Sequence, residues 1–142
     1  MTGTVFRRNS AGLSGFGGAL YCGASHPNIA WCTFVENEGA QGGSIYCRDG
    51  SAPVIMHTII AHSSPGEALF CEASTPFTTL SCIFENGEMN ELCGSYTTYI
   101  LHVDPLFCDL YSGDLTLSGD SECLPENNSW GIQIGALGQG CE

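Results

Sequence analysis

Short apolar runs recur along the chain at a nearly constant interval. Apolar and other residues alternate within each run, as they do in a half-buried β-strand. The three clearest runs are Gly17-Gly18-Ala19-Leu20-Tyr21-Cys22, Gly42-Gly43-Ser44-Ile45-Tyr46-Cys47 and Gly66-Glu67-Ala68-Leu69-Phe70-Cys71, at intervals of 25 and 24 residues. A fixed period of roughly 20 to 50 residues is typical of a repeat architecture.

A second element follows each of these runs and opens with a Ser-x-Pro turn. The turns are Ser25-His26-Pro27, Ser51-Ala52-Pro53 and Ser74-Thr75-Pro76. Each period therefore contains glycine, strand, turn and strand, with no helical pattern. We predict an all-β fold, a right-handed parallel β-helix or solenoid of about five coils with a C-terminal cap. Residues 1–142 form one domain, with repeat coils in 1–103 and the last coil and cap in 104–142.

Alternation within the strands assigns side chains to the two faces of each sheet. In the first strand of each coil we expect the aliphatic and cysteine positions to lie inside, which leaves the aromatic positions outside. The inner pairs are Leu20 with Cys22, Ile45 with Cys47 and Leu69 with Cys71, and the outer residues are Tyr21, Tyr46 and Phe70. In the second strand the expected inner pairs are Cys32 with Phe34, Thr58 with Ile60 and Cys82 with Phe84.

Charge narrows the range of partners. The chain carries 15 acidic residues and three arginines, Arg7, Arg8 and Arg48, without a lysine, so its net charge is -12. Such a surface repels the phosphates of nucleic acids and anionic membrane surfaces. No apolar stretch approaches the roughly 20 residues that span a bilayer, so we expect neither nucleic-acid binding nor membrane insertion.

Nine cysteines favour an oxidising, extracellular or cell-surface location. Cys22, Cys47 and Cys71 are expected to stack in the core as free thiols, because Cβ atoms on adjacent parallel strands lie about 4.8 Å apart, farther than a disulfide prefers. Cys123 and Cys141 bracket the last predicted strand. We predict a disulfide between them that closes the open end of the core.

The repeats resemble those of secreted bacterial right-handed β-helix proteins with a pectin-lyase-like architecture. The resemblance lies in Cys32-Thr33-Phe34-Val35-Glu36-Asn37, Gly42-Gly43-Ser44-Ile45-Tyr46-Cys47, Asp104-Pro105-Leu106-Phe107-Cys108 and the closing Ile134-Gly135-Ala136-Leu137-Gly138-Gln139-Gly140-Cys141. It implies that Cys141 lies at or near the C-terminus, so that any missing sequence is N-terminal. Because the chain has the cysteines of an exported protein but no signal peptide at its start, we expect Met1 to begin a fragment of a longer protein. The matching motifs specify the fold and not the activity.

Catalytic and metal-binding chemistry is sparse. Asp104, Asp109, Asp114 and Asp120 are candidate calcium ligands, although aspartate also suits turns. No cofactor is predicted besides calcium. A polysaccharide lyase needs a basic residue beside the substrate, and the three arginines are poorly placed for that role. The paired aspartate motifs of a polygalacturonase are absent. His57 and His62 match no zinc framework and are expected in surface turns.

The outer aromatic column, Tyr21, Tyr46 and Phe70, is the candidate binding surface, because aromatic rings stack on sugars or on a protein partner. The alternative is a self-supporting stack that stabilises the sheet.

These observations support two hypotheses of function. The first is a non-catalytic structural or adhesive extracellular module that presents a rigid acidic surface to a glycan or protein. The second is a fragment of a carbohydrate-active enzyme, a polysaccharide lyase or hydrolase, whose catalytic coils lie outside this chain. We also expect self-association through the N-terminal coil, near Phe6, Leu13, Phe16 and Leu20.

Overall fold

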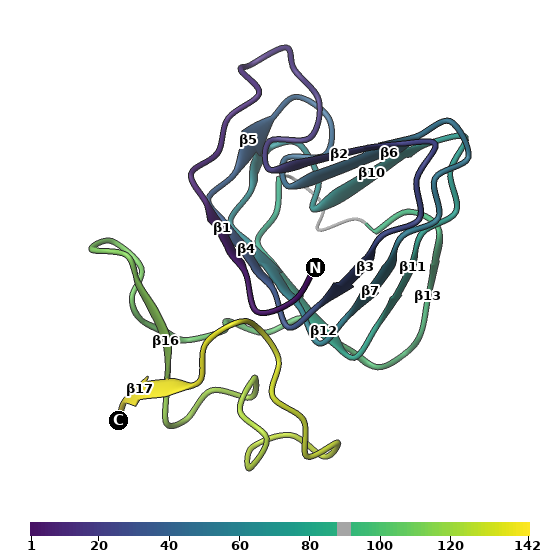
Figure 1. Cartoon of the computed structure of the whole chain (residues 1–142). Helices are drawn as coiled ribbons and strands as arrows, with labels where there is room; N and C mark the ends of the chain where they lie inside the picture. The colour runs from purple at the N-terminus through teal and green to yellow at the C-terminus, as the bar shows by residue number, and fades with distance from the viewer. Residues whose placement is uncertain (88–91) are drawn as a thin grey trace.

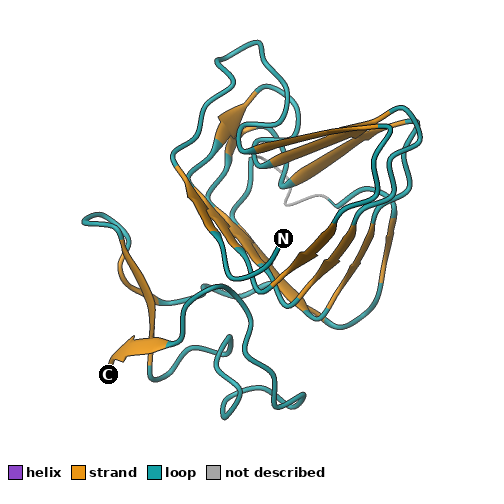
Figure 2. Cartoon of the chain, in the orientation of Figure 1, coloured by secondary structure: helices purple, strands orange, loops and turns teal. Residues whose placement is uncertain are grey.

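The computed structural model describes residues 1–87 and 92–142, and in this part of the chain every regular element is a β-strand (Figure 2). The repeats wind into a solenoid with three parallel sheets around a common core (Figure 1). The predicted fold class is therefore confirmed.

The first three coils contribute one strand to each sheet in turn, and the described strands of the later coils extend two of the three sheets. Sheet I contains β1 (Val5–Arg7), β4 (Thr33–Val35), β8 (Ile59–Ala61), β12 (Ser81–Phe84) and β14 (Ile100–Leu101). Sheet II contains β2 (Leu20–Gly23), β6 (Ile45–Arg48) and β10 (Leu69–Glu72). Sheet III contains β3 (Asn28–Ala30), β7 (Val54–Met56), β11 (Phe77–Thr79) and β13 (Ser95–Tyr96). A short fourth pair, β5 (Glu38–Gly39) and β9 (Ser64–Pro65), follows sheet I.

Sheet II has the predicted register. Ile45 pairs with Leu20 on one side and with Leu69 on the other, and Cys47 pairs in the same way with Cys22 and Cys71. Ile45, Leu69, Cys22 and Cys47 belong to the core cluster inside the solenoid. Because like residues stack on like, each coil buries the apolar face of its neighbour.

The predicted register of sheet I is wrong in the third coil. Thr33 pairs with Ile59 and Ile59 with Cys82, so the two coils are 26 and 23 residues long at this sheet. The inner column is therefore Phe6, Phe34, Ile60 and Ile83. Cys82 and Phe84 point out of the solenoid instead of into it, because aligning the cysteines by sequence shifts the strand by one residue and reverses its faces.

The chain bends between sheets at single residues with a left-handed backbone. These residues stack into three columns, with φ between 45° and 57°: Ala24, Asp49 and Ala73; Trp31, His57 and Leu80; and Arg8, Glu36, His62 and Glu85. Such φ values are uncommon for residues other than glycine. The next coil stabilises them, because the amide of Glu36 donates to Ala61 O and that of His62 donates to Phe84 O. His57 and His62 thus lie in turns, as predicted.

Asparagines hold the bends after sheet I from inside. Asn37 and Asn86 are fully buried. Asn37 Oδ1 accepts hydrogen bonds from the backbone and side-chain amides of Asn9, while its Nδ2 donates to Phe6 O. Asn86 Oδ1 accepts from the amide of Ser63 in the preceding coil. Each asparagine therefore satisfies buried backbone groups of the coil before its own.

A glycine is required where the chain turns toward sheet II. Gly42 has φ +60°, and a Cβ atom there would collide with the carbonyl of Ile45. The Gly-Gly pairs that mark the repeat therefore allow the backbone of the turn to pack closely against the strand that follows it.

Residues 104–142, the C-terminal segment, cover the outer face of sheet I. The segment contains a hairpin of β15 (Phe107–Asp109) and β16 (Asp114–Ser118), with β17 (Gln139–Cys141) parallel to β16. A second apolar cluster joins sheet I to this segment: Ile59, Ala61, Cys82, Leu117, Cys123, Leu124 and Ile134.

The predicted cap is therefore misplaced. Figure 1 shows the segment beside the solenoid, and no described residue of the segment belongs to the cluster inside the coils. Backbone contacts fix this position, because Gly135 N donates to His57 O and Ala136 N donates to Thr33 Oγ1. The outer face of sheet I carries apolar side chains, and the C-terminal segment shields them from water. From the sequence alone these positions were assigned to solvent or to the wrong face.

Candidate binding groove

The predicted aromatic column exists, but its middle ring is covered. Tyr46 stacks between Tyr21 and Phe70, with ring centroids 5.4 and 5.6 Å apart, and Phe16 stacks on it at 4.9 Å. Tyr46 is 3% exposed and Tyr21 is 49% exposed. Since its neighbours occupy the faces of Tyr46, only the outer rings have a face free for a ligand.

A carboxylate further fixes Tyr46. The phenol donates a hydrogen bond to Glu72 Oε2, and this bond, together with burial, raises the pKa of Tyr46 to about 12. The column thus functions structurally as a ladder of neighbouring rings across sheet II.

The four candidate calcium ligands are not brought together. Asp104 accepts a hydrogen bond from the amide of Leu106, Asp109 from that of Ser112, and Asp114 from that of Thr116. These are local turn contacts that aspartate commonly makes, and Asp120 lies exposed in another turn. Among the described residues no group of three or more His, Cys, Asp or Glu side chains could hold a metal ion.

The predicted disulfide between Cys123 and Cys141 is wrong. Cys141 is bonded to Cys108, with Cα atoms 5.9 Å apart, because β17 pairs with β16 and this pairing brings it to the start of the hairpin. Cys123 is a buried free thiol facing sheet I. Cys71, predicted to be free, is bonded to Cys93 of the next coil, whereas Cys22 and Cys47 are free and buried as predicted.

The bends after sheet I form a column of charged and titratable side chains, with one residue from each coil. Arg8 contacts Glu36, with Nε and Oε2 2.8 Å apart, and His62 Nδ1 lies 3.4 Å from Glu85 Oε2. Because each bend points its side chain outward, Arg8 lies beside Glu36 and His62 lies beside Glu85 along the solenoid.

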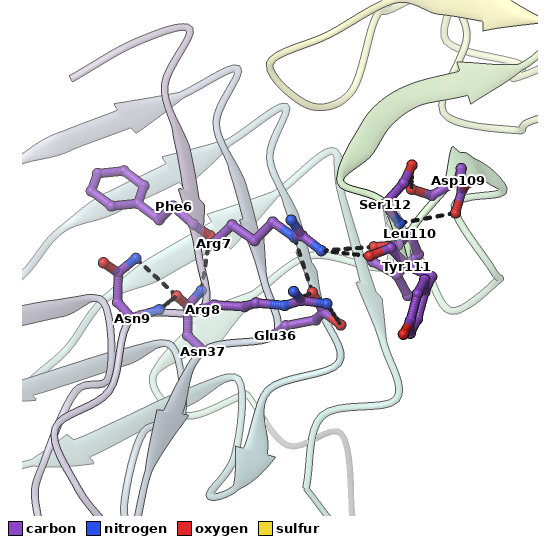
Figure 3. A network of polar contacts seen from close by, with 10 residues as sticks. All are labelled: Phe6, Arg7, Arg8, Asn9, Glu36, Asn37, Asp109, Leu110, Tyr111 and Ser112. Atoms are coloured by element: carbon purple, nitrogen blue, oxygen red, sulfur yellow. Dashed lines mark hydrogen bonds and ion pairs between the residues drawn. The ribbon is translucent and has the colours of Figure 1, made fainter.

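Arg7 connects this column to the C-terminal segment (Figure 3). Its Nε donates to Glu36 Oε2 at 3.0 Å, and its Nη2 donates to Leu110 O at 2.9 Å. Burial of Glu36 opposes ionisation, but hydrogen bonds from Arg8 and Arg7 outweigh it and hold the pKa of this carboxyl below its usual value. Glu36 is therefore an anion fixed by two guanidinium groups.

A groove of about 540 Å³ opens beside this network. Leu13 of the loop between β1 and β2 lines one side, and Leu110 of the β15–β16 turn lines another. The remaining lining residues are Glu36, Asn37, Glu38, His62, Ser64 and Pro65. Leu13 is 79% exposed, and Tyr111, next to Leu110, is 90% exposed. The groove thus combines acidic and imidazole groups with protruding apolar side chains.

Most of this groove is not evident from the sequence. The sequence places Leu13 at a different contact, and it does not indicate Glu38, His62 or Leu110 as ligand-binding residues. Glu36 and His62 occupy equivalent positions, because each directly follows a strand of the same sheet. This equivalence is the feature of the sequence that could have placed the two side chains in one column. The contribution of Leu110 could not be read from the repeat, since it depends on where the C-terminal segment packs.

Comparison with known proteins gives one short match. Residues 3–23 match the Chlamydia polymorphic membrane protein (Chlamydia_PMP) repeat. The matched residues include Phe6-x-x-Asn9 and Gly17-Gly18-Ala19-Leu20, which are the inner-column, asparagine and glycine positions described above. No curated protein and no solved structure matches the chain significantly. Among the described residues, no helix is long and apolar enough to cross a membrane.

Proposed function

We propose that this chain is a non-catalytic structural or adhesive module at the cell surface, which presents a rigid acidic face to a protein or glycan. The observation that carries the proposal is the groove itself, which is lined by the exposed Leu13, by Leu110 and by the carboxylates of Glu36 and Glu38. A ligand-binding site of this kind needs shape and charge, not reactive groups.

The charge distribution favours a basic protein over an acidic glycan. All three arginines are bound within the chain, Arg7 and Arg8 to Glu36 and Arg48 to Asp49. The structure gives the Glu38 carboxylate no ion-pair partner among the described residues. With a net charge of -12, the surface attracts cationic groups and repels anionic ones.

A surface location is part of this proposal. Its support is the match of residues 3–23 to a repeat whose name is that of a membrane protein, and the two disulfides, which persist in oxidising surroundings. The proposal would be contradicted if antibodies against the chain labelled only permeabilised cells of its source.

Biolayer interferometry with the immobilised chain tests the binding function. The probes are an alternating arginine–leucine hexapeptide, its glutamate–leucine counterpart, and a panel of neutral and acidic oligosaccharides. We expect the arginine peptide to bind and to weaken with added salt. Glu38→Gln or Leu13→Ser should weaken it by about fivefold, the effect of one exposed interaction.

Glu126→Gln, an exposed carboxylate outside the groove lining, is the matched control and should leave binding unchanged. Binding of oligosaccharides alone would favour the glycan ligand. No binding of either class, or equal effects of Glu38→Gln and Glu126→Gln, would overturn the groove assignment.

The enzyme hypothesis places catalysis outside this chain, so it makes a different prediction. The isolated chain should release no reducing ends from polygalacturonate, whereas a longer protein containing it should do so. Release by the isolated chain would contradict both hypotheses as stated.

The first coil is the proposed surface for self-association. The strands β1 and β2 are each at one edge of their sheets, whereas residues 1–3 bond to the outer edge of β3. Phe16, 46% exposed, lies in the same coil. Phe6 is partly buried, because it stacks on Phe34 at 4.6 Å. Light scattering at micromolar concentration should show a dimer that Phe16→Ser weakens; a monomer throughout would exclude this contact.

A further inference from the structure

Two free thiols, those of Cys82 and Cys123, lie within hydrogen-bond reach of each other where the C-terminal segment meets sheet I. Cys82 lies on the outer face of β12, Cys123 lies in a turn of the segment, and both are fully buried in the same apolar cluster. The thiol of Cys82 also donates to Val103 O at 3.3 Å. The neighbouring Cys123, followed by burial, raises the pKa of Cys82 well above its ordinary value.

We propose that Cys82 and Cys123 are a site of disulfide formation that covalently joins the C-terminal segment to the repeats. The two bonds already present do not cross this boundary, because Cys71 and Cys93 lie within the coils and Cys108 and Cys141 within the segment. A bridge between Cys82 and Cys123 would be the first disulfide between the two regions, which are otherwise joined only by the main chain.

The local backbone permits this bond. Cys123 is outside the strands, and it is held by a hydrogen bond from Ile134 N to its carbonyl and by one from its amide to Ser121 Oγ. A residue in a turn can adjust to the geometry of a disulfide more easily than one in a strand that is hydrogen-bonded on both sides.

The other neighbouring thiols provide an internal comparison. Cys22 and Cys47 pair in register on adjacent parallel strands of sheet II, and Cys47 is bonded into the sheet on both sides. Their side chains project in parallel, about 4.8 Å apart, so that closing the gap requires a strand to move. Cys22 and Cys47 should therefore stay reduced under conditions that oxidise Cys82 and Cys123.

The reaction is thiol–disulfide exchange with a small-molecule disulfide. The thiolate of one cysteine attacks the reagent, forms a mixed disulfide and releases one reagent thiol. The second thiolate then attacks the sulfur of the first cysteine, which forms the protein disulfide and releases the second reagent thiol. The protein loses two electrons and two protons, and the reagent disulfide gains them. Because both thiols are buried, the rate depends on local opening of the segment.

Oxidised glutathione, added to the whole chain in urea concentrations below the unfolding transition, tests the proposal. Thiol titration after denaturation should show a fall from five free thiols to three, because one bridge consumes two. Cleavage at glutamate followed by mass spectrometry should identify one new linked pair, the peptides of Cys82 and Cys123. The midpoint of thermal unfolding should rise by roughly 10 °C.

Cys123→Ser and Cys22→Ser are the matched variants. The first should keep its remaining four thiols, and the second should still lose two. Retention of five thiols in the wild-type chain at every urea concentration below unfolding would overturn the proposal, as would a new link between Cys22 and Cys47. Since the peptide map needs only the wild-type chain, a variant that fails to fold does not affect the conclusion.

Discussion

The coils and the C-terminal segment are stabilised in different ways. In the coils, equivalent residues stack in columns, and most strand amides and many amides of the bends donate to the neighbouring coil. In the segment, strands are few and one side chain organises the turns. Asn128 donates to the carbonyls of Glu122, Leu124 and Ile132 and accepts from two backbone amides. Periodic contacts make the coils depend on one another, whereas the segment depends on individual contacts.

This contrast predicts that the C-terminal segment needs the folded coils, whereas the coils can remain folded without the segment. The segment rests on the outer face of sheet I, so that unfolding of the coils should release it. Loss of the segment, by contrast, exposes only one outer face. The two tryptophans, Trp31 in the coils and Trp130 in the segment, can report the two regions separately in the variants Trp130→Phe and Trp31→Phe.

The largest effect is expected from Phe34→Ala. Phe34 is fully buried and stacks on Phe6, so that its removal should cost about 3 to 5 kcal/mol of unfolding free energy. Urea unfolding should show both tryptophan signals shifting together. A shift of the Trp31 signal with an unchanged Trp130 signal would show that the segment folds without the coils.

Removal of the segment's disulfide should have a smaller and local effect. The double substitution Cys108→Ser and Cys141→Ser opens a loop of sequence separation 33 and should cost about 2 to 4 kcal/mol. We expect the Trp130 transition to move to lower urea while the Trp31 transition stays in place. Equal shifts in both signals would contradict this one-sided dependence.

The two structural asparagines allow a matched test. Asn37→Ala leaves the amide of Asn9 and the carbonyl of Phe6 without their buried partner, at a cost of about 1 to 3 kcal/mol. Asn128→Ala removes several hydrogen bonds and should cost a similar amount. The first should shift both unfolding transitions and the second only that of Trp130, as measured by fluorescence in urea. A shift of only the Trp130 transition by Asn37→Ala, or of both transitions by Asn128→Ala, would contradict this account of the two regions.

The smallest effect concerns the ion pairs that Glu36 makes with Arg7 and Arg8 within the coils. The lowered pKa of Glu36 means that its contribution is present above its ordinary pKa and lost as the pH falls through the value in the folded chain. Glu36→Gln should cost no more than about 1 kcal/mol at pH 7.

The test compares urea midpoints at pH 7 and pH 3. Wild type and Glu36→Gln should differ less at pH 3, whereas Glu126→Gln should behave as wild type at both. A difference that grows on acidification would contradict the sign of the pKa shift.

The same contrast explains which features could be predicted. Recurring glycines and alternating strands predicted the solenoid and the register of sheet II, because each position is constrained by its copies in neighbouring coils. The one-residue error at Cys82 arose where successive coils differ in length, so that matching identical residues misled the alignment.

The segment and the groove have no such copies. Cys141 offered several possible partners, and the pairing with Cys108 depends on the path of β16 and β17. Leu110 lies at the groove where Arg7, more than a hundred residues earlier in the sequence, donates to its carbonyl. Contacts of this kind do not recur at a fixed interval in the sequence, and the residue types involved do not by themselves reveal which residues make the contact.

The position of the segment also limits how this repeat array can evolve. It contacts Arg7, Thr33, His57 and Cys82, which belong to successive coils. Duplication of one coil between β1 and β12 would separate these attachment points by about 4.8 Å more than the segment spans at present. Solenoids commonly gain and lose repeats by recombination, but here such a change would detach one end of the segment. Natural variation in length should therefore occur outside these coils, with the number between β1 and β12 kept constant.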